Sequence, residues 1–192
     1  MDRRDQILST AAVLFAERGF HGVSVADLGA ACGISGPALY RHFASKDAVL
    51  AEMLTSISDE LLEVARERVA EAATDGESLA ALIDWHIDFA LANRALIVVQ
   101  DRDWASLPDE AREQVRSTQN SYVGVWVSVL RRLDPQLAAA RARAMAQAAF
   151  GLLNSTPRTG RLPEPELRGL LGAMALAALR IPHDAGEGAP QS

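Results

Sequence analysis

Hydrophobic residues recur at intervals of three and four along most of this chain, which is the spacing of one face of an α-helix. In residues 3–18 the repeat places five apolar side chains on one face before Gly19: Ile7, Leu8, Ala11, Leu14 and Phe15. It predicts further helices over residues 25–32, 36–43, 46–73, 77–92, 96–100, 108–133, 135–155 and 165–181. Residues 96–100 suit a strand by composition, but no second strand is expected to pair with them. The pattern therefore predicts an all-α fold of about nine helices.

Two short helices with polar caps are expected before residue 46. Ser24, followed three residues later by Asp27, has the spacing of a capping box. Ser35 is expected to cap the next helix, where Pro37 is tolerated because first-turn amides have no intrahelical partner. Gly33 separates the two helices.

The second of these helices has an apolar and a polar side. Leu39 and Phe43 lie four residues apart, so both point into a small core. The other expected members of that core are Phe15, Phe20, Val23, Leu28 and Ile34. The outer side then carries Gly36, Pro37, Ala38, Tyr40, Arg41 and His42. A short helix with an exposed polar side is typical of a helix-turn-helix unit that enters the major groove of DNA, although a merely solvated helix face is the alternative.

The stretch FAERGFHGVSVADLGAACGISGPALYRHFASKDAVL, residues 15–50, resembles the tetracycline-repressor (TetR) family of one-component transcriptional regulators. The rest of the chain resembles the family in its helix pattern alone. The resemblance implies a helix-turn-helix DNA-binding head over residues 1–50 and a helical ligand-binding and dimerisation body over residues 51–182. Residues 183–192 are rich in glycine, proline and polar residues, which predicts a disordered tail.

We expect the main DNA contacts from the polar side of the head. Tyr40 and His42 are phosphate ligands by the resemblance, and their donors suit phosphate oxygens. Arg41 is the residue best suited to read guanine, because its guanidinium can bond two acceptors of that base. Lys46 lies in a first helical turn, where free amides and the macrodipole also attract anions. Ser35 is a helix cap, a phosphate ligand or both.

Three small residues occupy positions where TetR-family proteins often carry base-contacting side chains: Gly36, Pro37 and Ala38. They have few donors, which predicts methyl and backbone contacts and a greater dependence on DNA shape. Val25, at the start of the preceding helix, is a candidate for one further apolar or backbone contact. Arg3 and Arg4 either reach DNA from a flexible arm or lie in a solvated terminus.

For the body, the resemblance implies a ligand chamber. The candidate ligand-binding residues are Trp85, His86, Phe89, Trp104, Tyr122, Trp126 and Asn154. Large aromatic side chains suit a small hydrophobic effector, neutral or anionic, although a place in the core is the alternative for each of them. A hydrogen-bonded core position is the default interpretation for His86. The stretch of residues 100–103, three of which are charged, is interpreted as a surface turn rather than a pocket mouth.

The last two predicted helices suit a homodimer interface. Residues 138–149 are dominated by alanine, and residues 167–179 mix leucine with glycine and alanine. Small side chains allow helices to approach closely, and two such helices from each subunit would form a four-helix interface with two-fold symmetry. Such a dimer matches a palindromic operator, and an effector would act by shifting helix 46–73 and the spacing of the two heads.

Charge and composition narrow these interpretations. The net charge is −6, but residues 1–50 hold five basic and five acidic residues, which predicts only modest non-specific affinity for DNA. The single cysteine, Cys32, cannot form an internal disulfide, which favours the cytoplasm. No secretion signal and no apolar run of membrane-spanning length are recognised, so no membrane association is expected.

The combined features predict a dimeric transcriptional regulator, a repressor that a small molecule releases from its operator. An enzyme is not expected, because we find no Walker loop, dinucleotide glycine pattern, nucleophile elbow or His/Cys cluster with metal-ligand spacing. No catalytic residue, metal or cofactor is therefore predicted. The alternative class is a helical interaction module that has lost DNA binding, which the neutral head and residues 36–38 leave open.

Overall fold

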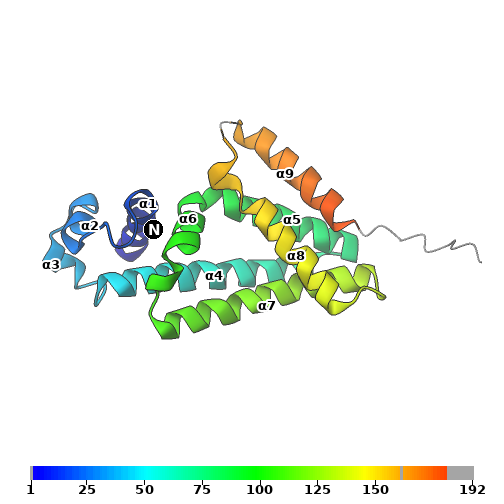
Figure 1. Cartoon of the computed structure of the whole chain (residues 1–192), viewed down its shortest axis with the longest axis horizontal. Helices are drawn as coiled ribbons and strands as arrows, with labels where there is room; N and C mark the ends of the chain where they lie inside the picture. Colours follow the sequence, from blue (N-terminus) through cyan, green and yellow to red (C-terminus); the bar gives the residue numbers. More distant parts are fainter. Residues whose placement is uncertain (1, 161, 181–192) are drawn as a thin grey trace, which may run out of the picture.

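The computed structural model describes residues 2–160 and 162–180, and within these residues it consists of helices joined by short loops (Figure 1). The elements are α1 (Arg3–Arg18), α2 (Val25–Ala31), α3 (Gly36–Leu39), α4 (Lys46–Glu71), α5 (Asp75–Ala92), α6 (Arg94–Asp103), a 3₁₀ turn (Trp104–Ser106), α7 (Asp109–Leu133), α8 (Ala139–Leu153), a second 3₁₀ turn (Thr156–Arg158) and α9 (Glu164–Leu179). The described part contains no strand, so the predicted all-α fold of nine α-helices is confirmed. The tail predicted over residues 183–192 lies outside the described residues.

Three helices have an end that differs from the sequence expectation by three residues or more. The third helix ends at Leu39, so residues 40–42 do not lie on it as expected. Instead the amides of Arg41 and His42 bond to carbonyls three residues earlier, which tightens the chain into a turn. The sixth helix is longer than residues 96–100 and begins at Arg94. The eighth begins only at Ala139, because a turn precedes it.

The predicted caps of the head are confirmed. Ser24 Oγ accepts from the amide of Asp27 at 3.1 Å, and the Asp27 carboxylate accepts from the amide of Ser24 at 2.8 Å. Ser35 and Ser45 cap α3 and α4 with a single bond each, since their Oγ atoms accept from the amides of Ala38 and Ala48 at 3.3 and 3.0 Å. Gly29 has no room for a side chain, since a Cβ there would lie 2.9 Å from the amide nitrogen of Gly36. This close approach sets α2 against α3 and fixes the angle of the helix-turn-helix unit.

The apolar interior forms two clusters, one at each end of the molecule. The head cluster contains the predicted inner residues Leu39 and Phe43, which are 1% and 3% exposed. It continues into the body through Val99 on α6 and Val115 on α7. The body cluster is built from α4, α5, α7, α8 and α9, with the fully buried Trp126 among its members. Helix α4 runs from the head into the body without a break at residue 50 and lies beside α7 (Figure 1).

No helix in the described residues combines the length and the apolar character needed to cross a bilayer.

Candidate DNA-binding face and ligand cavity

The outer side of the helix-turn-helix unit faces solvent, as predicted. The side chain of Tyr40 is among the more exposed aromatic groups, at 55%, and Ser35, Pro37 and Arg41 are also exposed. The remaining candidate residues are half-buried: Val25, Gly36, Ala38 and His42. All of the candidate DNA-contacting residues except Lys46 thus lie within α2 or α3 or within three residues of α3, and these two helices lie at one end of the molecule (Figure 1).

The two N-terminal arginines are held against the head and do not form the flexible arm considered from the sequence. Arg4 pairs with the Glu52 carboxylate, donates to the carbonyl of His42 and lies 4.3 Å over the Phe43 ring. The hydrogen bond to Glu52 raises the pKa of Arg4. Arg3 donates to the carbonyl of Cys32 at 2.6 Å. Both side chains therefore brace α1 against its neighbours in the head.

Lys46 occupies a different environment from the one its sequence position suggests. Its Nζ donates to the carbonyls of Phe20 and Val23, both at 2.8 Å, and lies 4.3 Å over the Phe20 ring. The ammonium group thus ties the loop between α1 and α2 to the start of α4. In the described residues, by contrast, no hydrogen bond or ion pair engages the guanidinium of Arg41, which leaves this cation available on the outer face.

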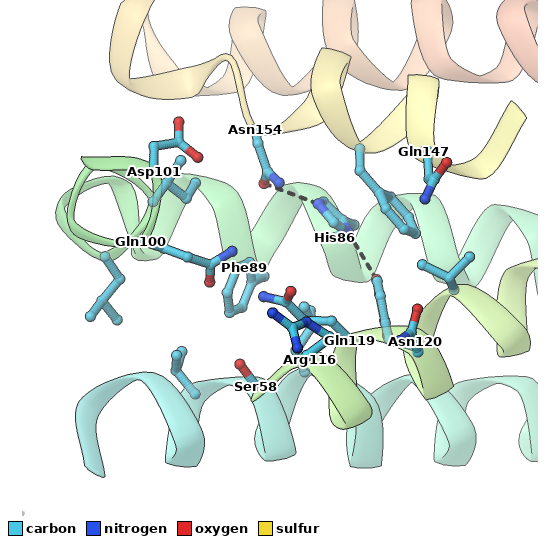
Figure 2. Close-up of a pocket in the computed structure, with 17 residues that line it drawn as sticks. Ser58, His86, Phe89, Gln100, Asp101, Arg116, Gln119, Asn120, Gln147 and Asn154 are labelled. Atoms are coloured by element: carbon cyan, nitrogen blue, oxygen red, sulfur yellow. Dashed lines mark hydrogen bonds between the residues drawn. The ribbon is translucent and has the colours of Figure 1, made fainter. Parts of the chain in front are cut away.

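The body contains a partly open cavity of about 440 Å³ lined by residues from α4, α5, α6, α7 and α8 (Figure 2). Seven of its lining residues are apolar: Ile57, Leu61, Phe89, Leu96, Ile97, Val123 and Phe150. The other ten carry polar groups: Ser58, His86, Gln100, Asp101, Arg116, Gln119, Asn120, Tyr122, Gln147 and Asn154. The cavity is therefore more polar than the aromatic chamber expected from the sequence.

Four of the seven predicted ligand-binding residues line this cavity, namely His86, Phe89, Tyr122 and Asn154. The three tryptophans do not. Trp85 lies on a different side of α5 from its neighbour His86. Its indole N–H donates to the carbonyl of Leu61 at 3.1 Å. Trp126 is fully buried behind Phe150, with ring centroids 5.1 Å apart, and Trp104 packs against the head cluster. Aromatic composition alone does not distinguish a cavity wall from the layer behind it.

His86 is the centre of a buried hydrogen-bonded group in the cavity wall. Its ring stacks on Phe150 at 5.0 Å with an interplanar angle of 5°. Burial lowers the pKa of His86 to about 4, so the ring is neutral near pH 7 and carries one N–H. Nε2 lies 3.1 Å from Asn154 Oδ1, which only accepts, so this nitrogen carries the proton. Nδ1 then accepts from the Tyr122 hydroxyl at 2.8 Å (Figure 2).

Sequence reasoning missed most of the polar lining. One available signal was Ser58, which interrupts the apolar stripe of α4 between Leu54 and Leu61 and is only 5% exposed. Gln147 was a second signal, because it is the one polar residue in the otherwise apolar stretch 144–150, whereas Gln119 offered none, because polar residues surround it in the sequence. Only the packing of α7 and α8 brings these amides to one space (Figure 2).

Residues 100–103 divide between two sites and do not form the surface turn that was expected. They lie in α6, where Gln100 and Asp101 line the cavity. The next two residues contact the head: Arg102 donates to the carbonyls of Phe15 and Ala16 at the end of α1, and Asp103 accepts from the amide of Phe20 at 3.3 Å. Asp103 is 6% exposed and pairs with Arg102 at 3.0 Å. One helix therefore connects the cavity to the head.

In the described residues no group of His, Cys, Asp or Glu side chains has the arrangement of a metal site. The geometry thus defines a class of protein: an all-helical binding protein with a helix-turn-helix surface at one end and a cavity in the body. The family model described as "Bacterial regulatory proteins, tetR family" matches residues 7–53, and the model described as "Tetracyclin repressor-like, C-terminal domain" matches residues 72–179. The chain belongs to the TetR family of bacterial regulatory proteins.

Individual relatives agree with this assignment. The HTH-type transcriptional repressor KstR2 of Rhodococcus jostii is 31% identical over 129 residues, which cover 67% of this chain and 63% of that protein. The chain thus spans just under two thirds of the length of this curated relative. A TetR-family regulator from Bordetella parapertussis has a TM-score of 0.81 at 27% identity, covering 90% of this chain and 93% of its own. PfmR from Thermus thermophilus has a TM-score of 0.79 at 27% identity, covering 91% and 97%. These relatives are regulators, so the class is not that of an enzyme.

Proposed function

We propose that this protein is a dimeric transcriptional repressor of the cytoplasm that leaves a palindromic operator when a small molecule fills the cavity. The main support is the position of α6, which lines the cavity at Gln100 and holds the end of α1 through Arg102 and Asp103. A ligand that displaces α6 would therefore change the position of the head. In this proposal residues 1–50 form the DNA-binding head and residues 51–182 the ligand-binding and dimerisation body.

The proposed DNA contacts follow from exposure and bonding within the head. Arg41 reads a guanine, because its guanidinium is exposed and engaged by no other group in the described residues. Tyr40 and His42 bind phosphates beside it, with Ser35 as a further hydroxyl ligand, and the other small residues of this surface approach the bases closely: Val25, Gly36, Pro37 and Ala38. Lys46 contributes by fixing the loop before α2.

The proposed dimer interface is the outer face of α8 and α9. Helix α9 exposes Leu170 by 46%, Met174 by 45% and Leu176 by 37%. Exposed apolar side chains concentrated on one helix are typical of a protein interface. The neighbouring Ala144 and Ala148 on α8 are also exposed and small enough to let a second copy approach.

DNA binding can be tested by selecting duplexes from a random pool with the full chain at low salt. We expect the enriched sequences to form an inverted repeat, because a two-fold dimer presents two identical heads. Arg41→Ala should then weaken binding to the selected duplex by at least about tenfold, measured by fluorescence anisotropy. Arg66→Ala, which removes an exposed arginine of α4 in the body, is the matched control and should bind as the wild type does.

The same experiment decides between two functions. The head is neutral, and its Lys46 ammonium is bonded to backbone carbonyls, so an interaction module without DNA binding is the second candidate. If the pool yields no enriched duplex, and Arg41→Ala binds the pool no more weakly than the wild type does, the result would favour that module. A sedimentation measurement on Met174→Glu tests the dimer separately, and we expect monomers with weakened DNA binding.

A further inference from the structure

We propose that the cavity binds an uncharged, planar organic molecule with a carbonyl or similar oxygen acceptor, and that the side-chain amide of Asn154 donates to this oxygen. The inference rests on the proposed function, in which the cavity holds the effector, and it names the chemical class of that effector.

The shape of one cavity wall favours a planar ligand. The rings of His86 and Phe150 are stacked almost parallel, and Tyr122 lies 5.3 Å from Phe150 between centroids. Phe89 adds a fourth ring, 6.0 Å from His86. Aromatic faces pack best against other flat rings in offset or edge arrangements. A volume of about 440 Å³ is that of a pocket for a small organic molecule.

The charges around the cavity favour an uncharged ligand. Asp101 and Arg116 are the two lining side chains with a formal charge at neutral pH, and both are more than half exposed. Each is already paired outside the cavity, Asp101 with Arg158 at 3.1 Å and Arg116 with Glu113 at 2.8 Å. The aromatic wall carries no charge, because His86 is neutral there. An ion placed against this wall would lose its hydration without gaining a counterion.

The polar groups exclude a plain hydrocarbon. Five carboxamide side chains line the cavity: Gln100, Gln119, Asn120, Gln147 and Asn154. Asn120 and Gln147 are exposed, but a ligand without polar atoms would remove water from the half-buried Gln100, Gln119 and Asn154 and leave their donors without partners, which is costly. An uncharged molecule with oxygen acceptors satisfies both the charge and the polarity of the lining.

Asn154 is the amide with a fixed direction. It lies at the end of α8, where its backbone amide bonds to the carbonyl of Phe150 at 2.8 Å. Its Oδ1 accepts from His86 Nε2, and His86 is itself held by Tyr122 (Figure 2). The Nδ2 donors have no acceptor within the described residues. His86 and Tyr122 are therefore positioning residues, and Asn154 presents two N–H groups for an oxygen of the ligand.

The test uses prodan, an uncharged naphthalene ketone whose emission reports polarity and hydrogen bonding, as the probe for the full chain. We expect prodan to bind, and the matched naphthoate, with a carboxylate in place of the ketone, to bind at least about tenfold more weakly. Asn154→Leu should weaken prodan binding by about tenfold, and so should Asn154→Asp, which keeps the acceptor for His86 but loses the donor. Gln136→Glu makes the same change of charge at an exposed site outside this cavity and should leave prodan binding unchanged.

Several outcomes would overturn this inference. These are an absence of prodan binding, naphthoate or octanoyl-coenzyme A binding as tightly as prodan, and prodan binding unchanged in a folded Asn154 variant. Circular dichroism establishes which variants fold, and Asn154→Asp decides if Asn154→Leu does not. Prodan binding with the expected losses but no effect on DNA binding would support the ligand class and contradict only the proposed role of the cavity as a switch.

Discussion

The head and the body each carry polar groups on an apolar scaffold, but the central polar groups are exposed in the head and buried in the body. In the head, Tyr40 and Arg41 stand in solvent above a core sealed by Leu39 and Phe43. In the body, His86 and Tyr122 lie inside, and His86 is bonded on both sides. Solvated side chains can adjust to a partner, whereas buried ones need fixed partners before a ligand arrives. Under the proposed function, shape and charge around the cavity would select the effector, while the exposed head would adapt to its DNA.

The strongest test of this comparison removes an apolar side chain from each region. Leu39→Ala opens a hole in a closed core and should lower the free energy of unfolding by about 2–5 kcal/mol. Phe89→Ala enlarges a space that already exists, so its cost should be smaller. Urea unfolding followed by circular dichroism measures both values. Equal losses, or a greater loss for Phe89→Ala, would contradict the difference between a closed core and a cavity wall.

The buried histidine gives a pH test of the body. Between pH 6.5 and about 4 the unfolded chain protonates His86 while the folded chain does not. The free energy of unfolding should therefore decrease as the pH falls through this window, by about 3 kcal/mol in total. His86→Gln lacks this group and should show a shallower decrease in the same urea titrations. Parallel pH profiles for the two proteins would show that the histidine is not held neutral by burial.

A smaller effect is expected where the two regions meet. Asp103→Asn keeps an acceptor for the amide of Phe20 but loses the ion pair with Arg102, whose guanidinium is partly exposed. We expect a loss of about 1 kcal/mol in the free energy of unfolding. Asp101→Asn is the control on the same helix and should cost less, because its pair with Arg158 is well exposed on both sides. A larger loss in the free energy of unfolding for Asp101→Asn than for Asp103→Asn would contradict the role given to Asp103 in joining the head to the body.

The smallest effect is expected at the surface of the body. Arg116→Ala removes an exposed pair with Glu113, three residues earlier on α7, and should change the free energy of unfolding by no more than about 0.5 kcal/mol. Repeating the urea titration at high salt should erase the difference, since salt screens exposed charges. A loss that persists at high salt would indicate that Arg116 has a packed role in the cavity wall.

Much of the head followed from local sequence rules. The caps at Ser24 and Ser35 and the inward direction of Leu39 depend on neighbours three or four residues away, and all are confirmed. The bonding of Lys46 did not follow, because its partners are carbonyls more than 20 residues earlier in the chain. The roles assigned to this surface in DNA binding stay predictions.

In the body, too, local sequence rules predicted some features and missed others. Helical periodicity placed His86 on an apolar face, and the structure gives it the hydrogen bonds that such a position requires. Periodicity did not separate Trp85 and Trp126 from Phe89, because all lie on helices with broad apolar surfaces. Which side of such a helix meets empty space depends on the packing of other helices.

The sequence by itself determined the helices, their caps, the helix-turn-helix unit and the family, because these depend on short-range spacing and on side-chain types. The tertiary structure alone decided that α6 contacts both the cavity and α1, and that amide side chains line the cavity. It also decided that Lys46 and Arg4 bond to other groups of the head. Each of these depends on contacts between residues distant in the chain, and their energies are settled only when whole helices pack together.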